Sequence, residues 1–63
     1  MVTDSDASDR VRTLLLRGDN LLKHGRSQDK AREAFEEARE VAAEAELDQP
    51  VRDLIERRLE QLA

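Results

Sequence analysis

The sequence predicts an all-α fold, made of an antiparallel helical hairpin followed by a third helix. Apolar residues recur at helical spacing in three stretches, and turn-forming residues separate these stretches. Nowhere do apolar and polar residues alternate with the β-branched enrichment that is typical of strands. A chain of 63 residues makes one domain at most. We therefore expect a flexible N-terminal tail over residues 1–7 and a three-helix domain over residues 8–63.

The first helix is expected over about residues 9–24. Ser8 or Asp9 has the side-chain oxygen that an N-cap uses to accept a backbone N–H bond. Apolar or small residues then share one face of the helix, namely Val11, Leu14, Leu15, Gly18, Leu21 and Leu22. Gly25 follows, and glycine favours the left-handed conformation that ends many helices. The preceding residues 1–7 show no periodicity, which is why we expect a tail there.

The second helix is expected over about residues 28–47, with Ser27 as its cap and Asp29 in its first turn. Its inner stripe is rich in alanine and consists of Ala31, Ala34, Phe35, Ala38, Val41, Ala42 and Ala45. Glutamates occupy the other side, and several are four residues apart. Because like charges at that spacing repel by about a few tenths of a kcal/mol each, packing must hold this helix together.

The third helix is expected over about residues 50–62. Pro50 suits the first turn of a helix and disfavours helical geometry at the residue before it, so Asp48 or Gln49 would be the cap. The apolar side of this helix consists of Val51, Leu54, Ile55, Leu59 and Leu62. A core of this size is marginal, since so short a chain buries only about 60% of its unfolded surface. Oligomerisation or binding to a partner is one common way to add stability.

Composition and charge exclude most kinds of chemistry. There is no cysteine and only one histidine, His24, so no metal-ligand spacing exists and we expect no metal site. No phosphate-binding glycine loop or nucleophile motif is present, and we expect no catalytic or cofactor-binding residues. The charge is uneven: residues 10–32 hold seven basic and two acidic residues, whereas residues 33–48 hold seven acidic and one basic. This suits antiparallel pairing of the first two helices.

The hairpin resembles a tetratricopeptide repeat. The motif positions read Leu14, Arg17-Gly18, Leu21, Ala31, Phe35, Ala38 and Pro50. Small residues at Gly18 and Ala31 would let the two helices cross closely. Arg17 stands where the family prefers leucine, Leu14 stands where it prefers an aromatic residue, the turn is one residue longer and the proline comes late. The resemblance covers about residues 11–45, with residues 51–63 as a capping helix.

The resemblance implies a protein-interaction module without catalysis of its own. A single repeat leaves one apolar face uncovered, because such arrays usually need about three units. Leu16 lies nearly opposite the apolar face of the first helix, where it is either a contact residue or an isolated exposed leucine. Arg58 lies within the apolar arc of the third helix, either paired with an acid across an interface or covering the core edge with its stem. The predicted partner-binding residues are Leu16, Arg17, Leu22, Leu54, Arg58, Leu59 and Leu62.

We therefore predict a non-catalytic protein–protein interaction module or small adaptor that forms a homodimer through an apolar helical seam. One alternative is a nucleic-acid-binding accessory protein that uses the basic residues Arg10, Arg12, Arg17, Lys23 and Arg26. Against it, phosphates would be repelled by the glutamates of the second helix. A second alternative is a non-catalytic subunit of an enzyme complex. No segment has the roughly 20 apolar residues of a membrane span, and no secretory signal is evident, so we expect a cytoplasmic protein.

Overall fold

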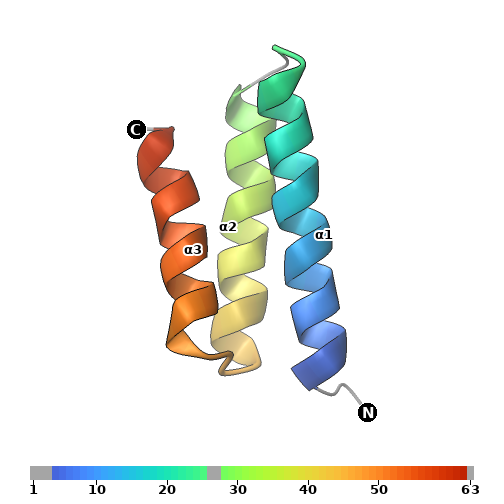
Figure 1. The fold of residues 1–63 in the computed structure, drawn as a ribbon, viewed down its shortest axis with the longest axis vertical. Coiled ribbons are helices and arrows are strands. Elements are labelled where there is room, and N and C mark those ends of the chain that lie inside the picture. Colours follow the sequence, from blue (N-terminus) through green and yellow to red (C-terminus); the bar gives the residue numbers. More distant parts are fainter. Residues whose placement is uncertain (1–3, 26–27, 63) are drawn as a thin grey trace.

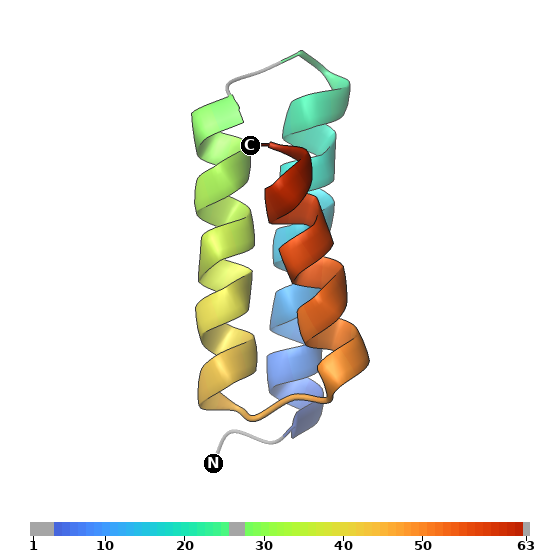
Figure 2. The ribbon, with the colours of Figure 1, turned by 90° about the vertical axis from the view of Figure 1, so that its left-hand side faces the viewer.

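Three helices make up the fold: α1 (Asp4–Lys23), α2 (Gln28–Glu44) and α3 (Gln49–Gln61). The structure is a computed structural model that describes residues 4–25 and 28–62. Helix α2 runs antiparallel to both α1 and α3, so α1 and α3 point in the same direction (Figure 1). Seen from the side, α1 and α3 lie one behind the other, and α2 flanks them both (Figure 2). The described residues contain no strand, which confirms the predicted all-α fold of a hairpin plus a third helix.

Helix α1 begins at Asp4, five residues before the start that we predicted. Residues 4–7 of the expected tail therefore belong to the helix, and residues 1–3 lie outside the described residues. Ser8 and Asp9, which we expected to cap this helix, lie inside it. The added turn is held by packing, because Ala7 is only 3% exposed and joins the same apolar cluster as Val11. Acidic residues near a helix N-terminus are also favourable.

Helix α1 ends as predicted at a left-handed glycine. Gly25 has a φ of +66°, and its N–H donates to the carbonyl of Leu22 at 3.1 Å. Because such a φ is strained for a residue with a side chain, glycine suits this position. Arg26 and Ser27, the expected cap of the second helix, lie outside the described residues.

Helix α2 ends at Glu44, three residues before the predicted end at Leu47. Glu46 has a left-handed φ of +52°, and its N–H donates to the carbonyl of Ala43 at 3.2 Å. The N–H of Leu47 donates to the carbonyl of Ala42 at 2.9 Å, which completes a Schellman motif. Leu47 is 8% exposed and packs in the cluster that contains Ala42. The apolar residue that we assigned to the helix thus lies just beyond it and closes it.

Helix α3 begins at Gln49, so Asp48 is its N-cap, as one of the two predicted caps. The carbonyl of Asp48 accepts N–H bonds from Val51 and Arg52 at 3.1 and 3.3 Å. Its side chain makes no capping bond, and Pro50 lies in the first turn. The helix therefore starts through proline and the backbone rather than through a side-chain cap.

The core divides into two clusters along the bundle. The first cluster consists of Ala7, Val11, Leu14, Ala38, Ala42, Leu47 and Ile55. The other consists of Ala31, Phe35 and Leu62, and the half-buried Leu15 and Leu59 pack against both clusters. Val11, Phe35 and Ile55 are the largest fully buried side chains and lie on α1, α2 and α3, so each of the three helices contributes to the core.

Gly18 marks the close approach of α1 and α2, as the sequence predicted. A Cβ built on Gly18 would lie 2.6 Å from Cζ of Phe35, which is too close for two carbon atoms. The aromatic ring therefore occupies the space that a side chain at position 18 would need. This contact fixes the separation of the two helices at the level of the second cluster.

Each pair of helices is also joined by one ion pair among the described residues. Arg10 of α1 reaches Glu37 of α2 at 3.2 Å, and Arg39 of α2 reaches Glu56 of α3 at 3.5 Å. The third pair joins Asp19 of α1 to Arg58 of α3 and is described with the candidate site. The first two pairs are largely exposed, so each contributes at most about 1 kcal/mol.

Candidate functional site

Two large apolar side chains are exposed on the described surface, and they lie on different helices. Leu16 of α1 is 57% exposed and Leu54 of α3 is 40% exposed. Both were predicted partner-binding residues. Single exposed leucines are ordinary on protein surfaces, so their relative position decides whether they form one surface.

An ion pair fixes the relative height of these two leucines. Nη2 of Arg58 donates to Oδ2 of Asp19 at 3.3 Å, and Nε of Arg58 lies 3.2 Å from Oδ1 without meeting hydrogen-bond geometry. Leu16 lies three residues before Asp19, and Leu54 lies four residues before Arg58. Since α1 and α3 run in the same direction and a helix rises about 1.5 Å per residue, the two leucines lie at nearly the same level. Each leucine is also the neighbour, on its own helix surface, of one member of the ion pair, so both lie on the side where α1 meets α3.

The same ion pair shows which acid Arg58 pairs with, a point that the sequence alone left open. The arginine is part-buried and pairs with an acid of its own chain. Its charged group thereby helps to attach α3 to α1. Arg58 thus has a partner within the fold, and any role at an interface would be added to this one.

Three further predicted contact residues belong to the core or its edge. Leu62 is 8% exposed and is a member of the second cluster, while Leu22 and Leu59 are half-buried and pack against it. The carbonyl of Leu62 also accepts a bond from Nη2 of Arg32 at 3.1 Å, so α2 caps the end of α3. The expected open seam is therefore largely filled by the third helix. Of the predicted apolar contacts, Leu16 and Leu54 are the ones left on the surface.

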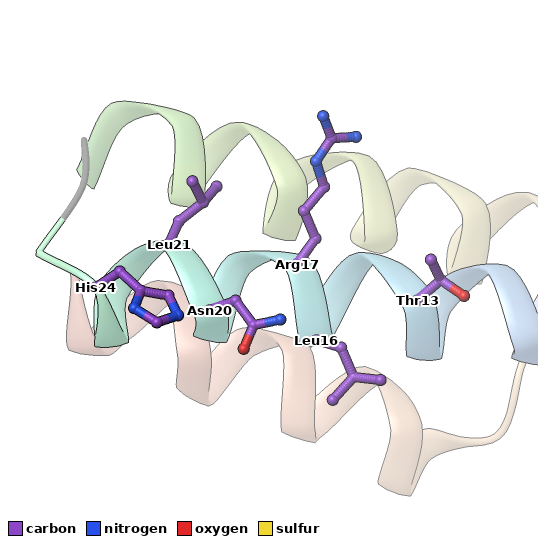
Figure 3. Close-up of a pocket in the computed structure, with 6 residues that line it drawn as sticks. All are labelled: Thr13, Leu16, Arg17, Asn20, Leu21 and His24. Carbon is purple, nitrogen blue, oxygen red and sulfur yellow. The ribbon is translucent and has the colours of Figure 1, made fainter.

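A shallow depression lies beside Leu16 on the outer side of α1. Its lining consists of Thr13, Leu16, Arg17, Asn20, Leu21 and His24 (Figure 3). In this view Leu16 points to the side of α3, whereas Arg17 and Leu21 point to the side of α2. The depression thus has leucine side chains on both flanks and polar groups between them.

Unpaired cations surround the depression. We define the outer face of α1 by its exposed residues Arg12, Thr13, Leu16, Arg17, Asn20, Lys23 and His24. Arg12 and Asn20 are each four residues from Leu16 and therefore lie next to it on the helix surface. Among the described residues, Arg12, Arg17 and Lys23 form no ion pair, whereas Arg10 is engaged with Glu37. The outer face thus offers an apolar anchor, Leu16, with three cations around it, while the exposed Asp9 lies on the same face three residues before Arg12.

The opposite side of the molecule is acidic. We define the acidic strip of α2 by its exposed residues Asp29, Glu33, Glu36, Glu40 and Glu44. Ala43 is the exposed apolar residue beside it. The strip lies opposite the buried stripe of α2, as predicted, and so points away from α1 and α3. The acidic strip is therefore charged but has no large exposed apolar side chain beside it.

The polar side chains of the described residues lie outside the core, since none of them is buried. No group of three or more His, Cys, Asp or Glu side chains is arranged there to hold a metal ion. His24 is exposed at the end of α1, and no nucleophile and base are brought together among the hydrogen bonds of the described residues. None of the helices in the described parts has the length and low charge that crossing a bilayer requires.

Leu16, Arg17 and Leu54 are predicted contact residues that the structure leaves exposed, whereas Arg12, Asn20 and Lys23, which are exposed as well, were not among the predicted contacts. The signal for Arg12 and Asn20 was present, because each is four residues from Leu16. Arg12 and Lys23 were considered only as contacts to nucleic acid, together with Arg26, which lies outside the described residues.

The fold and the surface define a small all-α protein of three helices, with an apolar and basic side and an acidic side. Comparison with protein families, with curated proteins and with solved structures found no match for this chain.

Proposed function

We propose that this protein is a non-catalytic protein-interaction module, and that its contact surface is the side formed by α1 and α3. The observation that carries the proposal is the position of Leu16 and Leu54, which lie at one level on two helices tied by the Asp19–Arg58 pair. Helices hold both leucines in place, so a partner would meet a rigid surface. Because Leu16 and Leu54 are 57% and 40% exposed, covering them would stabilise a complex by about 0.7–1.5 kcal/mol for each side chain.

The hairpin geometry supports the resemblance to a tetratricopeptide repeat without deciding membership of that family. Gly18 against Phe35 is the close helix crossing that the resemblance implies, and α3 packs on α2 as a capping helix would. Modules of this kind act by binding other proteins. The resemblance therefore supports the same function as the exposed leucines do.

Site-specific photo-crosslinking would test the contact surface. A photoreactive amino acid is placed at Leu16, at Leu54 or, as the matched control, at Glu40 in the acidic strip, and the full chain is expressed in its source organism. We expect the same protein to be crosslinked from positions 16 and 54 and not from position 40. The identified protein is then purified and its affinity measured for the wild type and for the L16D/L54D double variant. Equal affinity for both, or no crosslink from either position, would contradict the proposal.

Self-association is one form that this function would take, since the sequence predicts a homodimer. Sedimentation equilibrium of the wild type and of the L16D/L54D double variant measures it directly. A dimer that the double substitution dissociates would place a second copy on this surface. If the wild type sediments as a monomer, the homodimer prediction is wrong, and the partner at this surface would be a different protein.

Nucleic-acid binding is the second candidate, favoured by the exposed Arg12, Arg17 and Lys23 on one helix. Titration against duplex and single-stranded DNA at low and high salt tests it, because phosphate contacts weaken steeply with salt.

A protein partner that proves to be an enzyme would instead identify the chain as a subunit of that complex.

A further inference from the structure

The outer face of α1 combines two features that together define the chemistry of its partner. Leu16 and Leu21 flank the shallow depression, so the face offers a seat for one apolar side chain. Arg12, Arg17 and Lys23 stand around it without ion pairs among the described residues. A partner that covers Leu16 also comes close to these three cations. Acidic groups on the partner would favour binding, and basic groups would oppose it.

We infer that this face binds an acidic amphipathic helix of another protein, which seats one apolar side chain beside Leu16 and places its carboxylates against Arg12, Arg17 and Lys23. The inference rests on the proposed function and names the class of partner. A helix lying along α1 would present apolar residues and acids at spacings of three and four, which match the spacing of Arg12, Leu16 and Asn20.

A second copy of this chain fits the face less well. If two copies met through the same face, the three cations of one would oppose the three cations of the other, because the two-fold contact is self-complementary. If the face met the acidic strip of a second copy, charge would match, but the strip has only Ala43 as its exposed apolar neighbour. The first arrangement would cover Leu16 with Leu16 of the other copy but only against the repulsion of the cations, and the second would leave Leu16 without a large apolar partner.

Nucleic acid also fits less well. Phosphates would meet the cations, but Leu16 and Leu21 offer them neither charge nor hydrogen bonds. The described part of the chain contains no exposed aromatic residue on which bases could stack, since Phe35 is fully buried.

The net charge of −4 leaves acids of this chain near one edge of the face. Arg17 points to the side of α2 and lines a second depression with Glu33 and Glu37. Leu16 points to the side of α3, away from these acids. We therefore expect an acidic partner to lie along the Leu16 side of the face, where Arg12 is next to Leu16 on the helix surface.

Two synthetic helical peptides test the inference. They share one row of leucines at helical spacing and differ only in having glutamate or lysine at the flanking positions. Each is titrated into the ¹⁵N-labelled full chain, at low and at high NaCl, and amide chemical shifts are followed. We expect the glutamate peptide to bind at least about tenfold more tightly, to lose affinity in high salt, and to shift the amides of Thr13, Leu16 and Asn20.

Variants of the chain separate the anchor from the charges. L16D should weaken the glutamate peptide by about tenfold or more, and R12E/R17E should weaken it and improve binding of the lysine peptide. The control is R57E, since Arg57 is an exposed arginine on α3, and it is compared with each of the single variants R12E and R17E so that the change in charge is the same. All these positions are exposed, and circular dichroism verifies that each variant folds.

Equal binding of the two peptides, insensitivity to L16D, or amide shifts centred on the acidic strip would overturn the inference. A dimer that L16D dissociates, or DNA binding that R12E/R17E abolishes, would assign the face to another occupant and overturn it as well. A different result would contradict the proposed function itself, namely that neither crosslinking nor sedimentation finds a protein bound to this side of the molecule. If crosslinking from Leu16 and Leu54 succeeds but the peptides show no charge preference, the function stands and the acidic partner does not.

Discussion

At Gly18, the absence of a side chain lets the ring of Phe35 lie against the backbone of α1. At Glu46, the backbone takes a left-handed φ of +52° although the residue has a side chain. The first residue fits its position and the second does not. At each position, a single substitution should therefore change the free energy of unfolding in a predictable direction.

In Gly18→Ala the new Cβ overlaps the buried ring of Phe35, which should cost about 1–3 kcal/mol. Alanine improves helix propensity by about 1 kcal/mol, so we expect a net destabilisation of up to about 2 kcal/mol. Urea unfolding followed by circular dichroism measures the change. As a control, Phe35→Leu in the Gly18→Ala background should cost less than the sum of the two single substitutions. A more stable Gly18→Ala variant would show that the helices have room to spare.

Glu46→Gly should stabilise the protein by about 0.5–1 kcal/mol. The left-handed conformation costs a residue with a side chain about 1–2 kcal/mol, and the greater freedom of glycine in the unfolded chain removes part of the gain. Thermal unfolding should therefore shift to a higher midpoint. Glu44→Gly is the matched control, since position 44 is still helical and glycine there should lower the midpoint. If both substitutions lower it, the Schellman motif does not govern this end of α2.

Of the three helices, α3 depends most on tertiary contacts for its stability. It is a short helix whose buried side chain in the first cluster is Ile55, and its end is held by Arg32 and by the Asp19–Arg58 pair. Isolated helices of this length are marginal in water, so packing supplies most of its stability. The orientation of α3 decides that Ile55 is inside and that Leu54, its neighbour in sequence, is outside.

Ile55→Ala should cost about 2–5 kcal/mol, since Ile55 is fully buried and its removal leaves a cavity. Leu54→Ala should cost clearly less, about 1 kcal/mol, because Leu54 is 40% exposed. Urea unfolding of the two variants side by side checks how α3 is docked. Similar losses for both, or a larger loss for Leu54→Ala, would mean that α3 presents a different face to the core.

At the scale of the whole molecule, small size and simple topology act together. Natural domains have about 0.05–0.15 kcal/mol of stability per residue, so a chain of this length has roughly 3–9 kcal/mol in total. Helices α1 and α2 are joined by a short turn and pack on each other, and so do α2 and α3. Most of the packing is therefore between neighbours in the sequence.

Folding should be a single exponential process on a scale of microseconds to milliseconds, because local contacts need little loop closure. Temperature-jump relaxation over a range of urea concentrations measures it. The Gly18→Ala and Ile55→Ala variants should unfold faster while remaining single exponential. A slow second phase in the wild type, or rates that change with protein concentration, would contradict folding as an independent unit.

The sequence by itself determined the number of helices, the stop at Gly25 and the close crossing at Gly18, because helical periodicity and glycine geometry are local properties. The tertiary structure decided what local properties leave open. It extended α1 back to Asp4 through burial of Ala7, and it ended α2 at Glu44 because Leu47 packs beyond a left-handed turn.

The candidate site divides in the same way. The position of Leu16 opposite the apolar face of its helix was readable from the sequence, and so were the basic residues around it. Which leucines of α3 stay exposed depends on how that helix docks, and docking buried Leu62 while leaving Leu54 on the surface. Likewise, Arg58 had several acids within reach in principle, and only the arrangement of three helices paired it with Asp19. Contacts between distant segments follow from packing in three dimensions, which a periodic pattern along one helix does not contain.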